Sequence, residues 1–316
     1  MFGLFRRKAP QPAASAARVP EALWARIEQS LPFLDFLPAP DRPRLRALAI
    51  EFLEQKEFHG ANGLPLTNEI MLSIALQACV PILNIGLDAY SGWVGIVVYP
   101  GEILIRRRET DEHGVVHEFD DTVLGEAWPD GPVVISWDVT DTATTAEGEP
   151  ESAAEPVQPA DSTASSATPY RIDYPSQAEA EPLAPNVVLH EFAHKLDMIN
   201  GGADGFPVLH ADMSRNDWAS AFSAAYDDFC ERVDHVFNDH AFNEHAFNEH
   251  ALPMDPYGAE HPAEFFAVAS ETFFEAPAVL LHAYPEVYRQ LAQFYRQDPA
   301  AGERALYGEP DSDRHV

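Results

Sequence analysis

The sequence predicts an α+β fold with a small sheet, and two observations support this class. Apolar residues recur at helical spacing between residues 44 and 58, at Leu45, Leu48, Ala49, Phe52 and Leu53. Short β-branched runs occupy residues 93–99, 103–105 and 133–137, too close together for helical crossovers between them. We therefore expect helices on both sides of a few short strands, packed as one α+β domain.

The elements follow in chain order. The stretch 44–58 is an amphipathic helix, and a second helix is expected over 70–79, where Thr67, Asn68 and Glu69 supply a polar start before an apolar run. The strands come next, with Pro100 and Gly101 separating the first two. Both helices are expected to form core scaffold.

Domain organisation follows from composition. The 316 residues are 46% apolar, which is enough for one large domain or two small ones. We expect a flexible leader at 1–19, helices and sheet at 20–140, and a C-terminal part at 185–316. Between residues 140 and 183 the chain holds nine acidic residues, and Arg171 is its one basic residue, so 141–184 is predicted to be a disordered acidic insert.

Charge and cysteine content restrict the partners and the compartment. The chain has 20 Lys and Arg against 51 Asp and Glu, a net charge of −31, which disfavours nucleic acids and anionic membrane surfaces as partners. Two cysteines exclude a disulfide framework and favour a reducing compartment. Neither a secretory signal nor a membrane-spanning run is recognisable, so we expect a cytoplasmic protein.

A five-residue repeat with regularly spaced histidines covers residues 235–250. A step of five rotates the side chain by about 140° on a helix and changes the face on a strand. The histidines therefore do not share a face, and the repeat is expected to be a surface loop or a helix extension without chemistry.

The segment 186–202 carries the chemistry. It is predicted to be a helix that begins at Asn186 and ends before Gly201. His190 and His194 lie four residues apart on one face, so both imidazoles can bind one ion, while Glu191 on the adjacent face can address a water. This is the His-Glu-x-x-His arrangement of zinc hydrolases.

A catalytic zinc site needs a third protein ligand. Asp197 and Asn200 stand where a metzincin would have Gly and His, which excludes that class. Glu264 and Glu271 remain as candidates, because they share one face of a helix expected after Pro262. Asp197, one turn beyond His194, is expected to orient the ligand helix.

With these residues the sequence resembles the Mlc titration factor A family of zinc peptidases. The resemblance implies a zincin-like, gluzincin-type fold and aminopeptidase-like activity. It implies Zn²⁺ held by His190, His194 and Glu264, with Glu191 as the general base and Tyr257 at the reaction centre. It extends over roughly residues 20–300, through the blocks 63–67, 77–79, 125–128, 131–133, 190–198, 255–257, 262–264, 266–268, 270–271 and 294–299.

The resemblance also implies a partner, the transcriptional repressor Mlc, and through it sugar phosphotransferase regulation. For a peptide substrate, the predicted strand 133–137 is expected to offer an edge that aligns an extended chain. The alternative is a non-catalytic repressor-binding module with a structural or vestigial zinc site. Glu191 favours catalysis, because a closed structural site has no use for a base beside an open position.

Overall fold

The computed structural model describes residues 19–110, 116–137, 185–240 and 252–308. The expected leader (apart from residue 19), the acidic insert at 141–184 and residues 241–250 of the repeat lie outside the described residues. Residues 235–240 of the repeat form the end of a helix, α6.

Both helices predicted in the N-terminal part are present, but the first is shorter at its end than the predicted 44–58, because residues 57–58 belong to strand β1 (Glu57–Gly60). The first is α2 (Asp41–Gln55), which ends at Lys56 because the backbone there becomes extended, with φ −104° and ψ 146°. The second is α3 (Asn68–Cys79), whose start is capped by the Thr67 side chain, which accepts a hydrogen bond from Ile70 N at 3.2 Å. The remaining helical elements of this part are α1 (Glu21–Gln29), η2 (Pro32–Phe36) and η3 (Leu87–Tyr90).

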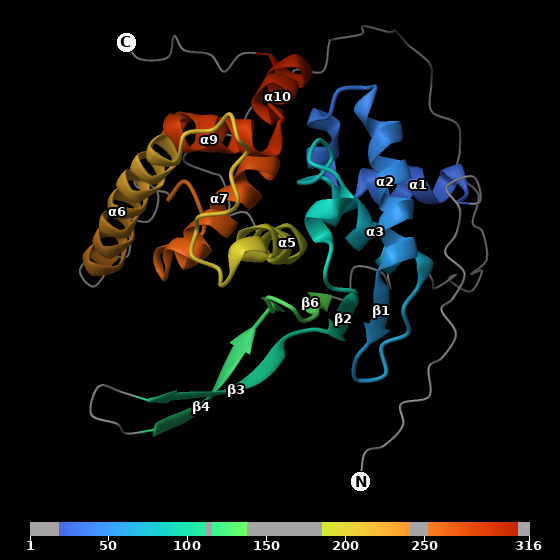
Figure 1. Cartoon of the computed structure of the whole chain (residues 1–316), viewed down its shortest axis with the longest axis horizontal. Helices are drawn as coiled ribbons and strands as arrows, with labels where there is room; N and C mark the ends of the chain where they lie inside the picture. Colours follow the sequence, from blue (N-terminus) through green and yellow to red (C-terminus); the bar gives the residue numbers. More distant parts are fainter. Residues whose placement is uncertain (1–18, 111–115, 138–184, 241–251, 309–316) are drawn as a thin grey trace, which may run out of the picture.

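The sheet has four strands in the order β1-β2-β6-β5. Strands β2 (Gly95–Pro100) and β6 (Val133–Trp137) match predicted runs, whereas β1 (Glu57–Gly60) and β5 (Gly125–Ala127) were not predicted. β1 pairs with β2 and β2 pairs with β6 in parallel, while β5 pairs with β6 antiparallel. The predicted run 103–105 begins β3 (Ile103–Thr110), which pairs with β4 (Val116–Val123) in a hairpin that extends away from the body (Figure 1).

The edge of the sheet differs from the expectation. Strand β6 pairs with β2 on one side and with β5 on the other, so the prediction that 133–137 offers an open edge is wrong. Ser136 N donates to Leu124 O at 2.7 Å and Trp128 N to Pro132 O at 3.3 Å. Hydrogen-bonded pairs alternate along an antiparallel ladder, so the N–H and C=O groups of Gly125 and Ala127 point away from β6. Within the part of the chain that the structure describes, the open edge beside the C-terminal part is therefore β5.

The C-terminal part is helical. Proline occupies the first position of α7, α8, α9 and α10, where it has no intrahelical N–H bond to lose, so each start is fixed by sequence. In Figure 1, α5 lies over the small sheet, between α1–α3 and the C-terminal helices. The elements are α5 (Val187–Asp197), η4 (Met198–Asn200), α6 (Arg215–His240), η6 (Pro256–Ala259), α7 (Pro262–Glu275), α8 (Pro277–Ala283), α9 (Pro285–Tyr295) and α10 (Pro299–Tyr307).

Helix α5 is buried along nearly its whole length. On the side toward the N-terminal part, the Phe192 ring packs against Phe52, Tyr90 and Trp93, with centroid distances of 5.6, 5.1 and 5.8 Å. Such tilted and edge-on aromatic pairs add to the stabilisation that burial provides. The helix that carries the histidines is thus fixed to both parts of the fold.

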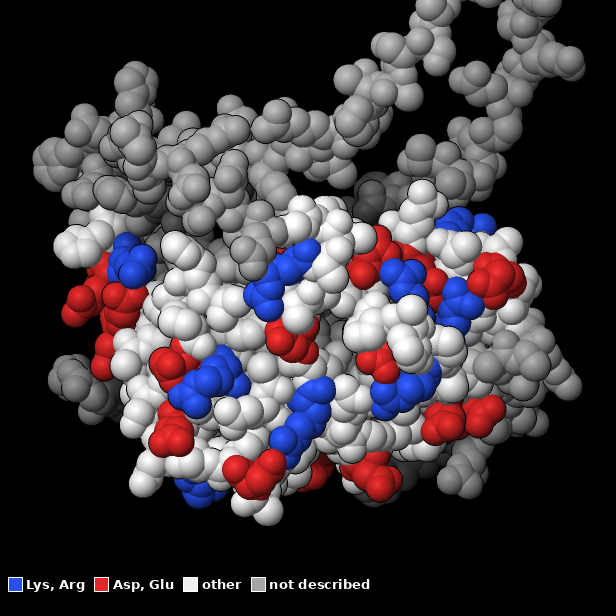
Figure 2. All heavy atoms as spheres, turned by 90° about the horizontal axis from the view of Figure 1, so that it is seen from above, with Lys and Arg blue, Asp and Glu red and all other residues white. Residues whose placement is uncertain are grey.

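The surface carries charges of both signs. Figure 2 shows acidic and basic side chains next to one another on the face seen from above. Exposed ion pairs such as Arg26–Glu69, at 2.7 Å, contribute little to stability, because water screens the two charges. Among the described residues, no helix is long and apolar enough to cross a membrane.

Candidate metal centre

Asn186 caps α5 with one polar contact and joins the start of this helix to α7 with two more. Its side-chain oxygen caps the helix by accepting from Leu189 N at 3.0 Å. Its backbone N–H donates to Glu271 Oε2 at 2.7 Å, and its Nδ2 donates to Glu275 Oε1 at 2.6 Å. These bonds fix the relative position of the two helices that carry the candidate ligands.

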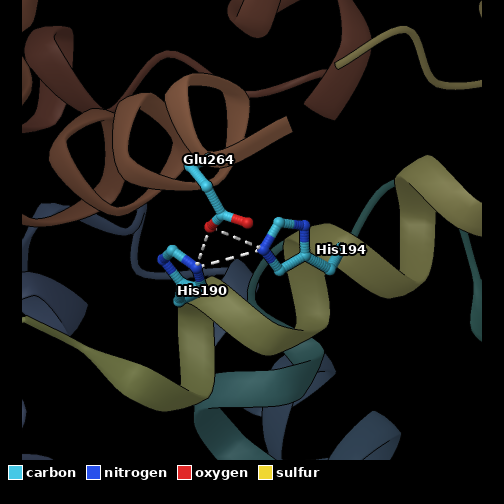
Figure 3. A group of neighbouring side chains, drawn as sticks. All are labelled: His190, His194 and Glu264. Atoms are coloured by element: carbon cyan, nitrogen blue, oxygen red, sulfur yellow. Dashed lines mark hydrogen bonds and ion pairs between the residues drawn. The ribbon is translucent and has the colours of Figure 1, made fainter. Parts of the chain in front are cut away.

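Three donor atoms converge between α5 and α7 (Figure 3). His190 Nε2 lies 3.0 Å from Glu264 Oε2, His194 Nε2 lies 3.1 Å from the same oxygen, and the two Nε2 atoms are 3.1 Å apart. In tetrahedral zinc sites with bonds of about 2.0–2.1 Å, neighbouring donors are about 3.3 Å apart. His190, His194 and Glu264 thus form a group that could hold a metal ion.

The protonation pattern of His190 supports that interpretation. Its Nδ1 lies 2.7 Å from Glu271 Oε1, so a neutral ring donates there and leaves a lone pair on Nε2. That lone pair faces a carboxylate oxygen and a second imidazole nitrogen. Acceptors that face one another at 3 Å repel unless a proton or a metal ion lies between them, and two imidazoles with one carboxylate are a donor set that zinc prefers.

The pKa shifts of His190 and Glu264 also show that the cluster favours a positive charge. Burial alone would lower the pKa of His190, but the hydrogen bonds with Glu264 and Glu271 raise it to about 10. For Glu264, burial would raise the pKa, yet His190 and His194 hold it well below its ordinary value. Burial lowers the pKa of His194. The cluster therefore attracts one cation strongly, and a divalent metal ion is such a cation.

Glu191 lies beside this cluster and outside its contacts. The side chain is 4% exposed, and its Oε2 has no hydrogen-bond partner among the described residues. Burial raises the pKa of Glu191 to about 8; His190 opposes the rise, and Glu264, Glu126 and Glu271 add to it. A buried carboxylate oxygen without a partner is costly, which is typical of a group kept for chemistry.

The place of Glu191 depends on a glycine of the open edge strand. A Cβ atom on Gly125 would lie 2.7 Å from Cγ and 2.8 Å from Cδ of Glu191. Real Cβ atoms do not approach that closely, so the bare backbone of β5 is what admits the carboxylate. Spacing in the sequence did not single out Gly125 for this role.

Tyr257 lies in η6, next to the histidines. Its ring centroid is 5.9 Å from that of His190, and the residue is 43% exposed. η6 begins where the Asp255 side chain accepts from Tyr257 N at 2.9 Å, so a local turn fixes this segment before α7. The tyrosine thus stands at the exposed side of the cluster.

Asp197 acts on a loop. Its Oδ2 accepts from Asp204 N at 2.9 Å and Gly205 N at 2.7 Å, and burial raises its pKa to about 6 against these two bonds. Gly205 has φ +80°, and a Cβ there would lie 2.9 Å from the carbonyl carbon of Pro262. Asp197 therefore holds the loop that packs against the start of α7.

Glu271, a candidate ligand in the sequence, lies behind the donor cluster. It contacts the nitrogen of His190 that points away from Glu264. The seven-residue spacing from Glu264 placed both carboxylates on one face of α7, and the histidine ring lies between them. The sequence pattern identifies both carboxylates, but it does not show which ring nitrogen of His190 each of them contacts.

Comparisons with known proteins identify the family of the chain. A family described as glucose-regulated metallo-peptidase M90 matches residues 4–154 and 172–296. The chain is 31% identical over 274 residues to Mlc titration factor A of Pectobacterium atrosepticum, with 86% of this chain and 85% of that protein aligned. It is 29% identical over 282 residues to the protein of that name from Serratia proteamaculans, with 89% of each aligned. It is 30% identical over 274 residues to the protein of that name from Yersinia pestis, with 86% of this chain and 83% of that protein aligned.

Proposed function

The chain belongs to the glucose-regulated metallo-peptidase M90 family, and from this premise we propose that it is a zinc-dependent, aminopeptidase-like peptidase with Glu191 as its general base. The observation that carries the proposal is the position of Glu191. It is buried, one of its oxygens has no partner among the described residues, and it lies between the donor cluster and the open edge of β5.

The residues that would hold the ion are His190, His194 and Glu264. Three protein ligands leave a coordination position for water, as catalytic zinc sites require. A bound zinc ion supplies Lewis acidity, which lowers the pKa of water and polarises a carbonyl group. Glu271 holds the His190 ring in the tautomer that keeps Nε2 available.

Glu191 moves the proton. As water attacks the scissile carbonyl carbon, the Glu191 carboxylate takes one of its protons and delivers it to the leaving nitrogen when the C–N bond breaks. The products are a carboxylate and a free amine. We assign to the Tyr257 hydroxyl the donation of a hydrogen bond to the oxygen that gains negative charge.

The open edge of β5 supports a peptide substrate. Gly125 and Ala127 direct their backbone N–H and C=O groups away from β6, and an extended peptide can pair with them as an added strand. Glu126, between them, is close enough to raise the pKa of Glu191. Negative charge at this edge favours a substrate with a free ammonium group, which supports the aminopeptidase-like assignment.

The test is the variant Glu191→Gln in the full-length protein. We expect one zinc per chain by metal analysis, as in the wild type, and loss of nearly all hydrolysis in a peptide library. Glu69→Gln, a change in an exposed ion pair, should leave both unchanged. Loss of the metal together with activity would make Glu191 structural. Zinc-loaded wild-type protein that cleaves no peptide in the library would favour the non-catalytic alternative.

A second role is supported by the relatives, which are named Mlc titration factor A. We propose that this chain also binds a repressor of the Mlc type and thereby affects sugar phosphotransferase regulation. Calorimetric titration of the zinc-loaded Glu191→Gln protein with such a repressor separates binding from cleavage, and absence of heat would contradict this role. We place both activities in the cytoplasm, in agreement with the free thiols of Cys79 and Cys230.

A further inference from the structure

We propose that Lys195 is a positioning residue that holds the substrate-binding edge strand β5 in place against the metal-binding helix. The proposal rests on the peptidase function proposed above. It concerns how the peptide is aligned relative to the donor cluster, and it adds no group that touches the reacting atoms.

The three hydrogen bonds of the Lys195 ammonium group all go to one turn. The residue follows His194 on α5 and is only 3% exposed. Its Nζ donates to Trp128 O at 2.6 Å, Pro129 O at 3.1 Å and Gly131 O at 3.3 Å. An ammonium group has three N–H donors, so three carbonyl oxygens use its full capacity. These carbonyls belong to the turn that joins β5 to β6.

The Trp93 ring is close to both Lys195 and a second buried lysine, Lys56. Lys195 Nζ lies 4.6 Å from the centroid of the Trp93 ring, and Lys56 Nζ lies 3.6 Å from it. Both distances are within the range of cation–π attraction. Lys56 donates to Tyr90 O at 2.6 Å and Trp93 O at 2.7 Å. Lys56 thus holds the segment before β2, whereas Lys195 holds the β5–β6 turn.

The position of the turn determines the position of the edge. β5 has three residues, and Gly125 at its start contacts Glu191 while Trp128 after its end contacts Lys195. Two adjacent turns of α5 therefore hold both ends of the strand. A peptide paired with β5 is then aligned with His190 and His194, which belong to that same helix.

The lysine pair provides a matched comparison, because both side chains contact Trp93 and both donate to backbone carbonyls. We would prepare Lys195→Met and Lys56→Met in the zinc-loaded full-length protein. The measurements are zinc content, Tm, kcat and KM for a cleaved peptide, and hydrogen exchange of the amides at 124–137.

We expect Lys195→Met to raise KM about 10-fold or more, with a smaller change in kcat, because the aligned edge is lost from substrate binding. Amides at 124–132 should exchange faster, and zinc content should stay at one per chain. Lys56→Met should lower Tm but leave KM within about twofold and the exchange at 124–132 unchanged.

Equal effects of the two variants on KM and on exchange would show that Lys195 only stabilises the core, and would overturn the proposal. If Lys195→Met does not fold, Lys195→Gln, which keeps two N–H donors, takes its place, and unchanged KM and exchange there would overturn it as well. Failure of the peptidase proposal is a separate result, in which wild-type protein would show no metal-dependent hydrolysis. Faster exchange at 124–132 in Lys195→Met alone would still show that Lys195 holds β5 in place.

Discussion

Glu271 lies 2.7 Å from Nδ1 of His190 and thereby sets which nitrogen of that ring faces Glu264. Its other oxygen accepts from Asn186 N at 2.7 Å, at the start of the same helix. One carboxylate thus fixes both the tautomer of a candidate ligand and the position of the helix that carries it. Glu264 and Glu271 contact opposite nitrogens of one ring, so they have different roles although they share a helix face.

Replacing Glu271 by Gln should weaken zinc binding without abolishing it. The loss of the charged partner makes His190 a poorer ligand, and changes behind a ligand typically cost about 10–100-fold in affinity. Glu264→Ala, which removes a donor atom, should abolish tight binding. Competition with a zinc chelator measures both. Glu69→Gln, in an exposed ion pair far along the chain from the ligands, is the control and should retain wild-type affinity; the prediction fails if Glu271→Gln also retains it.

Replacing Gly125 by Ala should damage catalysis while leaving the metal site intact. The added methyl would lie 2.7 Å from Cγ of Glu191 and displace the base. A misplacement of about 1 Å can cost about 10²-fold in rate. Zinc content should not change, since the donors lie on α5 and α7. Gly202→Ala, where a Cβ meets open space, serves as the control. Wild-type kcat in Gly125→Ala would contradict the role of this close approach.

Replacing Tyr257 by Phe should preserve zinc and lower kcat. The ring packs near His190 in either form, but the hydroxyl that donates to the developing negative charge is lost. Removal of one such donor typically costs about 10²–10³-fold in kcat. Steady-state kinetics and metal analysis test this, with Tyr307→Phe, 41% exposed, as the comparison. An effect on KM alone would instead place Tyr257 in substrate binding.

Glu275 predicts a pH-dependent difference in stability. Burial raises its pKa to about 7; Asn186 opposes the rise, and Glu271 adds to it. Between pH 4.5 and 7 the folded protein keeps a proton that the unfolded chain releases, so this group's contribution to stability falls as pH rises. Glu275→Gln has no titrating group at this position, so its stability does not fall with pH for this reason. Its free energy of unfolding relative to wild type should therefore increase from pH 5 to pH 7.5, by about 1–3 kcal/mol. Denaturant unfolding at both pH values measures it, and an equal difference at the two would contradict the prediction.

Local signals predicted much of this fold. The start of α5 at Asn186 and of α7 at Pro262 follow from capping and proline chemistry, which act within a few residues. His190 and His194 come together because four residues make about one helical turn. Such features depend on near neighbours in the chain, and the sequence displays them directly.

The parts that were not predicted depend on contacts between distant segments. β5 has three residues, too few for an alternating pattern, and the open edge was therefore assigned to 133–137. Lys195 binds backbone carbonyls, which every residue possesses, so no residue type marks its partners. The closeness of Gly125 to Glu191 joins residues 66 positions apart. None of these contacts has a periodicity that a sequence can show.

The candidate centre draws on both sides of the segment 138–184. His190, His194, Glu264 and Glu271 all follow it, whereas Gly125 and the open edge of β5 precede it. Under the function proposed above, the residues that would hold the ion and the strand that would align the peptide are encoded in different stretches of the gene. Substitutions in β5 would then alter peptide alignment while the donor atoms stay unchanged, so specificity could evolve separately from metal binding.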